Sequence, residues 1–324
     1  MRKLLFILLL LFSASASAKV DIYYGNGIWA FRELSTDGCN HDKAAAECGA
    51  IALEDKLKRE GILNDPTIDT NDKGNKVTLQ YNIGRGYLDD ILETFFQIRE
   101  SGQLDDVWFF TLVGAVLSGN PIIAVGVLVA AIAPMQDTKE FEQKNVDKMV
   151  DAYTRYSVDE GDQIMLVSHS QGNLFANRVF DELNATGYDY KNFANVQVAS
   201  PADQVRAPIG KHITICGDMV INPIPHSMRC NAEADGSGLM HGFDEVYLAN
   251  EDPHNQIMNA VKGQISVLKD PSKAKEARDN GAIDSDHDQA GIIPTLKSLP
   301  YLGLLAAAMI AWMRWALRRE EQEA

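Results

Sequence analysis

The stretch that decides the fold runs from residue 163 to residue 172 and reads QIMLVSHSQG. Its first five residues, 163–167, form an apolar run typical of a strand buried in a parallel sheet. Apolar residues at helical spacing begin two positions after the stretch and predict a helix over 174–183. A buried strand followed by a sharp turn and a helix therefore places Ser170 at the carboxyl end of the strand.

The segments around this stretch alternate between strand and helix patterns. Short apolar or alternating runs predict strands, and apolar residues spaced by three or four predict helices. This alternation indicates an α/β fold with a mostly parallel sheet flanked by helices. The expected strands cover 20–24, 77–83, 163–167, 195–199 and 212–216, and the expected helices cover 42–60, 88–99, 145–156, 174–183 and 257–268.

Composition indicates one large globular domain, which we expect over residues 19–270. The chain has 324 residues, of which 46% are hydrophobic and 23% are charged. It carries 45 acidic against 30 Lys and Arg residues, a net charge of −15. Because no basic run supplies phosphate contacts, we do not expect nucleic acid as a partner.

The amino terminus predicts export. Arg2 and Lys3 precede the apolar run 4–12, and Ala16-Ser17-Ala18 is a small-x-small cleavage site, so residues 1–18 read as a signal peptide. An uncleaved anchor is the alternative, although the run is short for a bilayer. We expect a periplasmic or extracellular protein, in which disulfides can form.

Four cysteines fall into two close pairs, Cys39/Cys48 and Cys216/Cys230. Four cysteines allow three connectivities, and we predict the two local disulfides. Neither pair has the spacing of a zinc site, so no metal site is expected.

The carboxyl terminus is a candidate membrane anchor over residues 298–319. Residues 298–313 are uncharged, and Arg314 could snorkel so that the apolar stretch extends to Leu317. A surface helix docked on the domain is the alternative. Residues 271–297 are polar and acidic, and we expect a linker there.

A second charge-free segment, residues 107–135, interrupts the α/β pattern and is split by Ser118-Gly119-Asn120-Pro121. If the strands 77–83 and 163–167 share one sheet, a single membrane span is excluded, because both strands must lie on the same side. A buried or lid-forming helical hairpin and a membrane-inserting hairpin remain as alternatives.

The turn Ser168-His169-Ser170-Gln171-Gly172 matches the strand–nucleophile–helix elbow, G-x-S-x-G, except that Ser168 replaces the first glycine. In this turn Ser170 is the candidate nucleophile, and the backbone N–H of Gln171 would face a developing oxyanion. The loop Gly25-Asn26-Gly27 is the candidate second oxyanion donor, through Asn26 and Gly27, because glycines permit close backbone approach. A plain turn is the alternative for this loop.

In a site of this type the acid and then the histidine follow the serine along the chain. Asp218 comes at the end of the second strand after the elbow, and Asp203 is the alternative acid. His241, in a loop before an apolar stretch, is the candidate base. His254 and His226 are the alternatives.

With these residues, the chain resembles the α/β-hydrolase superfamily, and its lipase-like members in particular, over residues 19–268. The resemblance rests on the elbow, on Asp218-Met219-Val220 with Pro223 and Pro225 after it, and on His241 before Tyr247-Leu248. It implies a serine hydrolase with a Ser-His-Asp triad that transfers an acyl group to water through an acyl-enzyme. No metal or organic cofactor is implied.

The leading hypothesis is an exported, membrane-associated serine esterase or lipase. The substrate would be a lipid ester, because 107–135 and 298–317 could both contact a membrane. A small soluble ester or a thioester is the next possibility. The alternatives from other classes are a catalytically inactive binding or membrane-docking protein on the same fold, and a membrane-disrupting toxin that inserts 107–135.

Overall fold

The structure is a computed structural model of the chain. Its described strands and helices lie between residues 20 and 268. The residues that it describes are 18–27, 42–82, 135–187, 192–207, 209–218, 220–222, 227–236, 240–270 and 272–273.

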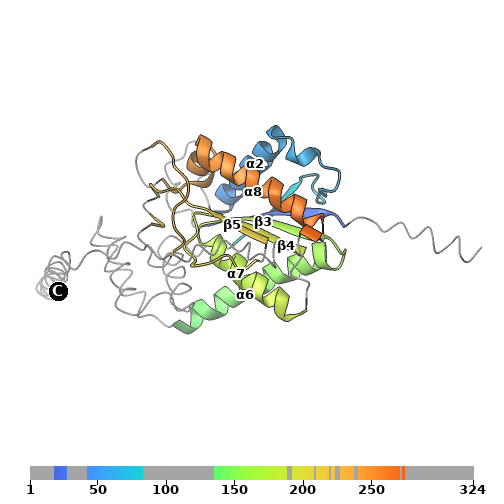
Figure 1. Ribbon diagram of the computed structural model, residues 1–324. Helices are drawn as coiled ribbons and strands as arrows, with labels where there is room; N and C mark the ends of the chain where they lie inside the picture. Colours follow the sequence, from blue (N-terminus) through green and yellow to red (C-terminus); the bar gives the residue numbers. More distant parts are fainter. Residues whose placement is uncertain are drawn as a thin grey trace, which may run out of the picture.

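The described residues form a five-stranded sheet in which every pair of neighbouring strands is parallel (Figure 1). The strand order is β2-β1-β3-β4-β5, so the chain moves outward from β1 to β2 and then returns to the other side of β1. The expected α/β class with a parallel sheet is therefore confirmed. The strands are β1 Val20–Gly25, β2 Val77–Gln80, β3 Gln163–His169, β4 Phe193–Val198 and β5 Ile209–Ile213.

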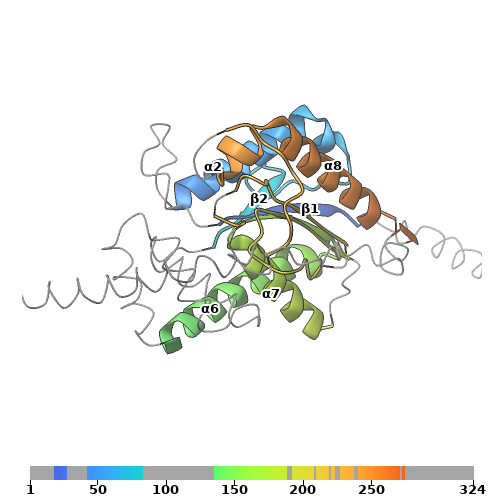
Figure 2. The same ribbon diagram turned by 60° about the vertical axis from the view of Figure 1, so that its left-hand side comes forward.

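Helices cover both faces of the sheet, two on each side among the described residues (Figure 2). The helices α2 (Asp42–Arg59) and α8 (Glu251–Leu268) pack on one face, and α6 (Met135–Tyr153) and α7 (Gly172–Ala185) pack on the other. Short helical segments complete the described elements: η2 Ile62–Asn64, η3 Thr154–Val158 and η5 Phe243–Tyr247.

Alternation along the strands divides the apolar side chains between two cores. In β3, Met165 and Val167 join the core beneath α2 and α8, whereas Ile164 and Leu166 join the core beneath α6 and α7. Because successive side chains of a strand point to opposite faces, one uninterrupted apolar run serves both layers. The hydroxyl of Ser168 and the ring of His169 continue this alternation, so they also leave the strand on opposite faces.

The centre of the sheet is a topological switch point. β1 pairs with β2 on one side and β3 on the other, and its register with β3 matches Gly25 to Ser168. In open parallel sheets ligands bind outside the carboxyl ends of the strands at such a point. The residues that follow β1 and β3, Asn26-Gly27 and Ser170-Gln171, therefore lie side by side at the expected ligand-binding edge.

Most expected elements occur, and several differ in their bounds. The helix expected over 257–268 begins at Glu251, and the strand expected over 77–83 ends at Gln80. The helix expected from residue 145 begins at residue 135. The sequence pattern does not reveal these first turns, because they are rich in charged residues and lack apolar residues at helical spacing. The strand expected over 212–216 is wrong by three residues, since β5 covers 209–213. A Cβ on Gly210 would lie 2.4 Å from Val205 Cγ1, so this glycine permits the preceding loop to pack on the strand.

Several predictions concern segments outside the described residues. They are the signal peptide 1–18 except Ala18, the helix 88–99, the charge-free segment up to residue 134, the linker from 274 on and the carboxyl-terminal apolar segment. Within the described part of the chain, no helix has the length and apolar character needed to cross a membrane.

At the amino edge of the sheet, three carboxylates gather around the start of β1. Oxygens of Asp21, Asp69 and Asp162 lie within 4.8 Å of one another. Lys19 neutralises part of this charge through Asp69 Oδ1, 2.9 Å from its Nζ. Burial, the largest cause, and the two neighbouring carboxylates together raise the pKa of Asp21 to about 6, against a hydrogen bond from Ser157 that lowers it. Asp21 is therefore a group whose ionisation opposes folding.

We expect Asp21→Asn to stabilise the protein at pH 8 and to have a smaller effect at pH 4. The pKa of Asp21 is higher in the folded than in the unfolded chain, so the contribution of this group to stability is greatest below about pH 4 and is lost as pH rises through about 6. Differential scanning calorimetry at both pH values measures the effect, with Asp159→Asn, at an exposed carboxylate, as control. An equal change in Tm at pH 4 and pH 8 would contradict the prediction.

Candidate active site

Ser170 occupies a strained turn between β3 and α7. Its φ is +54°, in the left-handed region that non-glycine residues adopt only at a cost of about 1–3 kcal/mol. The turn is held by its surroundings, since the backbone N–H of Ser170 donates to Val198 O on β4 at 3.0 Å. Ala199 and Met240 also have positive φ, at +50° each. All three strained residues lie next to the carboxyl edge of the sheet, where strain commonly accompanies function.

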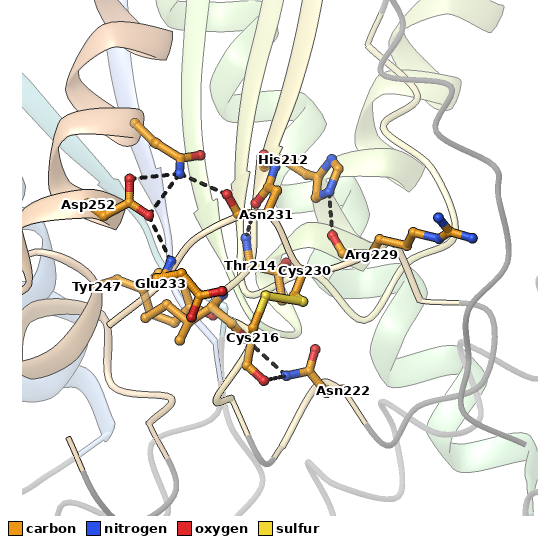
Figure 3. Close-up of a disulfide and its surroundings, with 12 residues drawn as sticks. His212, Thr214, Cys216, Asn222, Arg229, Cys230, Asn231, Glu233, Tyr247 and Asp252 are labelled. Atoms are coloured by element: carbon orange, nitrogen blue, oxygen red, sulfur yellow. Dashed lines mark hydrogen bonds between the residues drawn. A yellow bond between two sulfur atoms is a disulfide. The ribbon is translucent and has the colours of Figure 1, made fainter. Parts of the chain in front are cut away.

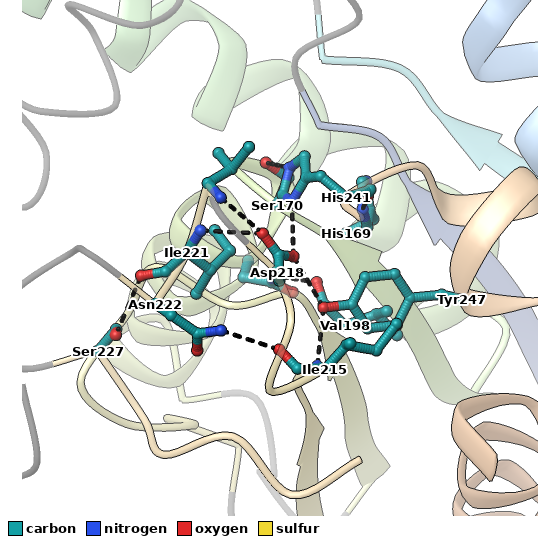
Figure 4. Close-up of polar contacts among 12 residues, drawn as sticks. His169, Ser170, Val198, Ile215, Asp218, Ile221, Asn222, Ser227, His241 and Tyr247 are labelled. Atoms are coloured by element: carbon teal, nitrogen blue, oxygen red, sulfur yellow. Dashed lines mark hydrogen bonds and ion pairs between the residues drawn. The ribbon is translucent and has the colours of Figure 1, made fainter. Parts of the chain in front are cut away.

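Ser170, His241 and Asp218 form a continuous chain of hydrogen bonds (Figure 4). His241 Nε2 lies 2.9 Å from Ser170 Oγ, and His241 Nδ1 lies 2.8 Å from Asp218 Oδ2. With the carboxylate as acceptor, Nδ1 carries the ring proton and Nε2 can accept the serine proton. The structure thus brings together the three residues that sequence analysis selected as nucleophile, acid and base.

Asp218 is fully buried, and each of its carboxylate oxygens has two donors. Oδ1 accepts the backbone N–H groups of Val220 and Ile221 at 2.9 and 3.0 Å, and Oδ2 accepts from His241 and from the Tyr247 hydroxyl at 2.8 and 2.9 Å. Burial alone would raise the pKa of Asp218, but the charge of His241 and these hydrogen bonds outweigh it and lower the pKa. The carboxylate therefore stays ionised beside the imidazole.

The loop that carries Asp218 is tied to a second loop by the Cys216–Cys230 disulfide (Figure 3). This confirms the predicted local pairing. Asn231 reinforces it, because its Oδ1 accepts the Thr214 N–H at 2.9 Å and its Nδ2 donates to His212 O at 2.8 Å. A disulfide that closes a loop of this length lowers the conformational entropy of the unfolded chain, which stabilises the folded state by about 3 kcal/mol.

The other predicted disulfide falls partly outside the described residues. Cys48 on α2 is disulfide-bonded, and Cys39, its expected partner, lies in a segment that the structure does not describe.

His169, next to Ser170, binds the backbone of His241. Its Nε2 lies 2.9 Å from the carbonyl oxygen of His241, and the two rings are 4.9 Å apart with a tilt of 40°. Burial lowers the pKa of His169 to about 3, with the neighbouring His241 contributing. His169 is therefore a neutral ring that donates through Nε2. Two consecutive elbow residues thus bind the backbone and the side chain of one histidine.

Two glycines allow β1 to approach the elbow. A Cβ on Gly27 would lie 2.4 Å from Ser170 Cβ and 3.1 Å from Ser170 Oγ, and a Cβ on Gly172 would lie 2.6 Å from Asn26 O. Neither position can accept a side chain without displacing its neighbour. The Asn26-Gly27 backbone therefore runs directly beside the Ser170 hydroxyl, as the prediction of an oxyanion donor requires.

Ser168 occupies the place of the usual first glycine and is accommodated by a buried partner. Its Oγ lies 2.6 Å from Asn173 Oδ1, and Asn173 Nδ2 donates to Val198 O at 2.8 Å. The serine thus links β3 to the first turn of α7 and to β4. The departure from the usual elbow pattern is structural and leaves the turn intact.

A buried amide network fixes the residues beside the elbow. Asn82, two residues after β2, donates its backbone N–H to Asn26 Oδ1 at 2.7 Å and its Nδ2 to Gln171 Oε1 at 3.0 Å. Asn145 on α6 donates to Asn82 Oδ1 at 3.4 Å. The side chain of Asn26 is thereby committed to Asn82, so a role for Asn26 toward an oxyanion would come from its backbone N–H.

The alternative site residues lie away from the Ser170–His241–Asp218 chain or outside the residues that the structure describes. His254 Nε2 on α8 lies 3.6 Å from Glu60 Oε1, and Asp203 follows β4 without contributing to the Ser170–His241–Asp218 chain. His226 lies outside the described residues.

Sequence reasoning missed the structural roles of Asn82, Tyr247 and His169. Asn82 carries a usable signal, because a polar residue at the carboxyl end of a parallel strand is a candidate for the site. Tyr247 carries no such signal, since only the folded η5 turn brings its hydroxyl to Asp218.

The arrangement combines a buried serine in a strained turn, an imidazole oriented by an ionised carboxylate, and the Asn26-Gly27 backbone held close to the serine. Chemically, this set can activate a hydroxyl for attack on an electrophilic carbonyl. No family model, no curated protein and no solved structure matches this chain.

We expect Gly27→Ala to reduce reaction of Ser170 with a fluorophosphonate probe by at least about 10²-fold, because the new methyl group must displace Ser170 or the oxyanion loop. Gly263→Ala on α8 is the matched control, since a Cβ there meets nothing within 4 Å, and it should leave the rate unchanged. The measurement is the rate of probe incorporation into folded protein. Wild-type rates in Gly27→Ala would show that the chain after β1 does not confine Ser170.

Proposed function

We propose that this chain is an exported serine hydrolase of the α/β-hydrolase type that cleaves carboxylic esters, with Ser170 as nucleophile. The observation that carries the proposal is the Ser170–His241–Asp218 chain at 2.9 and 2.8 Å, set at the switch point of a parallel sheet. A strained serine, a correctly oriented imidazole and a buried carboxylate seldom coincide without a catalytic reason.

In the proposed reaction, Ser170 Oγ attacks the ester carbonyl carbon while His241 Nε2 takes the hydroxyl proton. The tetrahedral oxyanion collapses, the ester C–O bond breaks, and the His241 proton passes to the leaving alcohol. Water then attacks the acyl-enzyme, giving its proton to His241, and the released Ser170 recovers that proton. Asp218 remains ionised throughout and holds the imidazolium.

The oxyanion would be bound by the backbone N–H groups of Gln171 and of the Asn26-Gly27 loop. Support comes from the position of Gln171 directly before the amino end of α7 and from the absence of room for a side chain at Gly27. The Asn82 network would hold both donors in place before the substrate arrives, which is the condition for an effective oxyanion hole.

The proposed substrate is a lipid ester, and the proposed location is a membrane surface outside the cytoplasm. The charge-free residues 107–135 and the apolar residues 298–317 support membrane contact. The long segment that includes 107–134 leaves the described fold after Asn82 and returns at the start of α6, so its connection begins beside the site. The Cys216–Cys230 disulfide fits an oxidising compartment.

Labelling with a fluorophosphonate probe tests the proposed mechanism. We expect the wild type to be labelled, Ser170→Ala to be unlabelled, and His241→Ala and Asp218→Asn to react about 10³–10⁴-fold more slowly, because each removes one member of the hydrogen-bonded chain. His254→Ala and Asp203→Asn are the controls and should retain the wild-type rate.

Folded wild type that is not labelled, either alone or with detergent or liposomes, would overturn the proposed hydrolase. Equal labelling of wild type and Ser170→Ala would do the same, because the reactive residue would then be another one.

Substrate presentation tests the lipid proposal separately. If the enzyme acts at a membrane surface, kcat/KM toward a medium-chain ester should rise by an order of magnitude or more above its critical micelle concentration. A short soluble ester with the same leaving group is the control. Equal rates on monomers and micelles would leave the hydrolase proposal intact and replace the lipid with a soluble ester.

A further inference from the structure

Tyr247 stands behind the acid of the proposed triad. Its ring is fully buried at the end of η5, and its hydroxyl lies 2.9 Å from Asp218 Oδ2 and 3.0 Å from the backbone nitrogen of Ile215 (Figure 4). Asp218 Oδ2 is the same oxygen that accepts from His241 Nδ1 at 2.8 Å. One carboxylate oxygen is thus shared by the base and by a tyrosine that the proposed mechanism does not use.

The direction of both tyrosine hydrogen bonds is fixed by chemistry. A backbone N–H can only donate, so the Tyr247 oxygen accepts from Ile215, and its single proton is left for Asp218. Burial, followed by the charge of Asp218, raises the pKa of Tyr247 well above its usual value, so the phenol keeps this proton. The hydroxyl is consequently a permanent donor to the acid.

The placement of Tyr247 follows from the π-helical turn η5, which comes directly after the loop that carries His241. η5 begins two residues after His241, and the backbone N–H of Leu248 bonds to Phe243 O at 2.8 Å, the wide spacing of a π-turn. Such turns often occur at functional sites. Here the turn returns the chain to Asp218, so a single segment contacts the acid twice, first through His241 and then through Tyr247.

We infer that Tyr247 is a positioning residue for the reaction, resting on the proposed function: by donating to Asp218 Oδ2, it fixes the carboxylate and limits the negative charge that this oxygen presents to His241. With Tyr247 removed, Oδ2 has one donor in place of two. The carboxylate then binds the Nδ1–H more strongly, and it also loses its link to Ile215 at the end of the sheet.

The other titratable groups around Tyr247 do not provide this donor. His169 has its ring 6.0 Å from that of Tyr247, and it is kept neutral by burial while its Nε2 is used by His241 O. Asp244, on η5, acts on His169 electrostatically and is itself a carboxylate. Tyr247 is therefore the side-chain donor that, together with His241, completes the coordination of Oδ2.

The test compares Tyr247→Phe with Tyr23→Phe in the full-length protein. Tyr23 is a matched control, because its buried hydroxyl bonds to Ser157 Oγ at 2.8 Å, at the opposite edge of the sheet. In Tyr247→Phe we expect kcat to fall about tenfold with KM unchanged, and the acidic limb of the pH–rate profile to move to higher pH by up to about one unit. Tyr23→Phe should lower Tm without moving that limb.

A second readout is independent of hydrolase activity. In proton NMR, the Nδ1–H of His241, assigned by its loss in His241→Gln, should move downfield in Tyr247→Phe, because the carboxylate binds it more strongly. Replacing Tyr247 with 3-fluorotyrosine, a more acidic phenol and stronger donor, should move the resonance in the opposite direction. This second variant retains the hydroxyl and so keeps the test available if Tyr247→Phe does not fold.

A resonance that does not respond to either replacement would overturn the positioning role, as would a kcat loss with no movement of the acidic limb. An NMR response in a protein that no fluorophosphonate labels would support the role of Tyr247 toward Asp218 and reject the proposed hydrolase. Labelling without any NMR response would support the proposed hydrolase and reject the positioning role of Tyr247.

Discussion

The parallel pairing of β1 with β3 is the constraint on which the site depends. Its register sets Gly25 opposite Ser168, so the next two residues of each strand must pass each other at the carboxyl edge. Space there is insufficient for a side chain at Gly27 or Gly172. Because Ser170 also adopts a positive φ, the close approach and the strained turn are parts of one local arrangement. The sheet, rather than the loops, therefore decides where the serine hydroxyl lies.

A second constraint is the cost of a buried carboxylate. Asp218 is ionised without contact with solvent, which is tolerable only when each lone pair has a donor. Two backbone N–H groups satisfy Oδ1, and His241 with Tyr247 satisfies Oδ2. This complete coordination explains why the acid loop adopts its tight turn. Among the described residues after β5, backbone N–H groups bind Asp218 or the neighbouring loop, as those of Val220, Ile221 and Cys216 do.

The sequence could predict the features that depend on short local patterns of residues. The apolar run of β3 and the elbow after it gave the sheet class and Ser170, and chain order then selected Asp218 and His241. The start of α6 and the bounds of β5 could not be read, because charged helix turns show no apolar period and Gly210 has a packing role. The Asn82 network and Tyr247 depend on contacts between distant segments, and no local pattern encodes them.

Asp218 and His241 lie outside the strands and helices among the described residues, whereas Ser170 directly follows a strand. Strand pairing fixes Ser170 through β3 and β4, but it cannot fix Asp218, which lies five residues beyond β5. Order in that region has to come from cross-links: the disulfide, the amide of Asn231, and the contacts of His169 with the His241 backbone. Each cross-link restricts a loop that would otherwise gain conformational entropy by opening. The disulfide and these hydrogen bonds therefore hold Asp218 and His241 in place, and strand pairing holds Ser170.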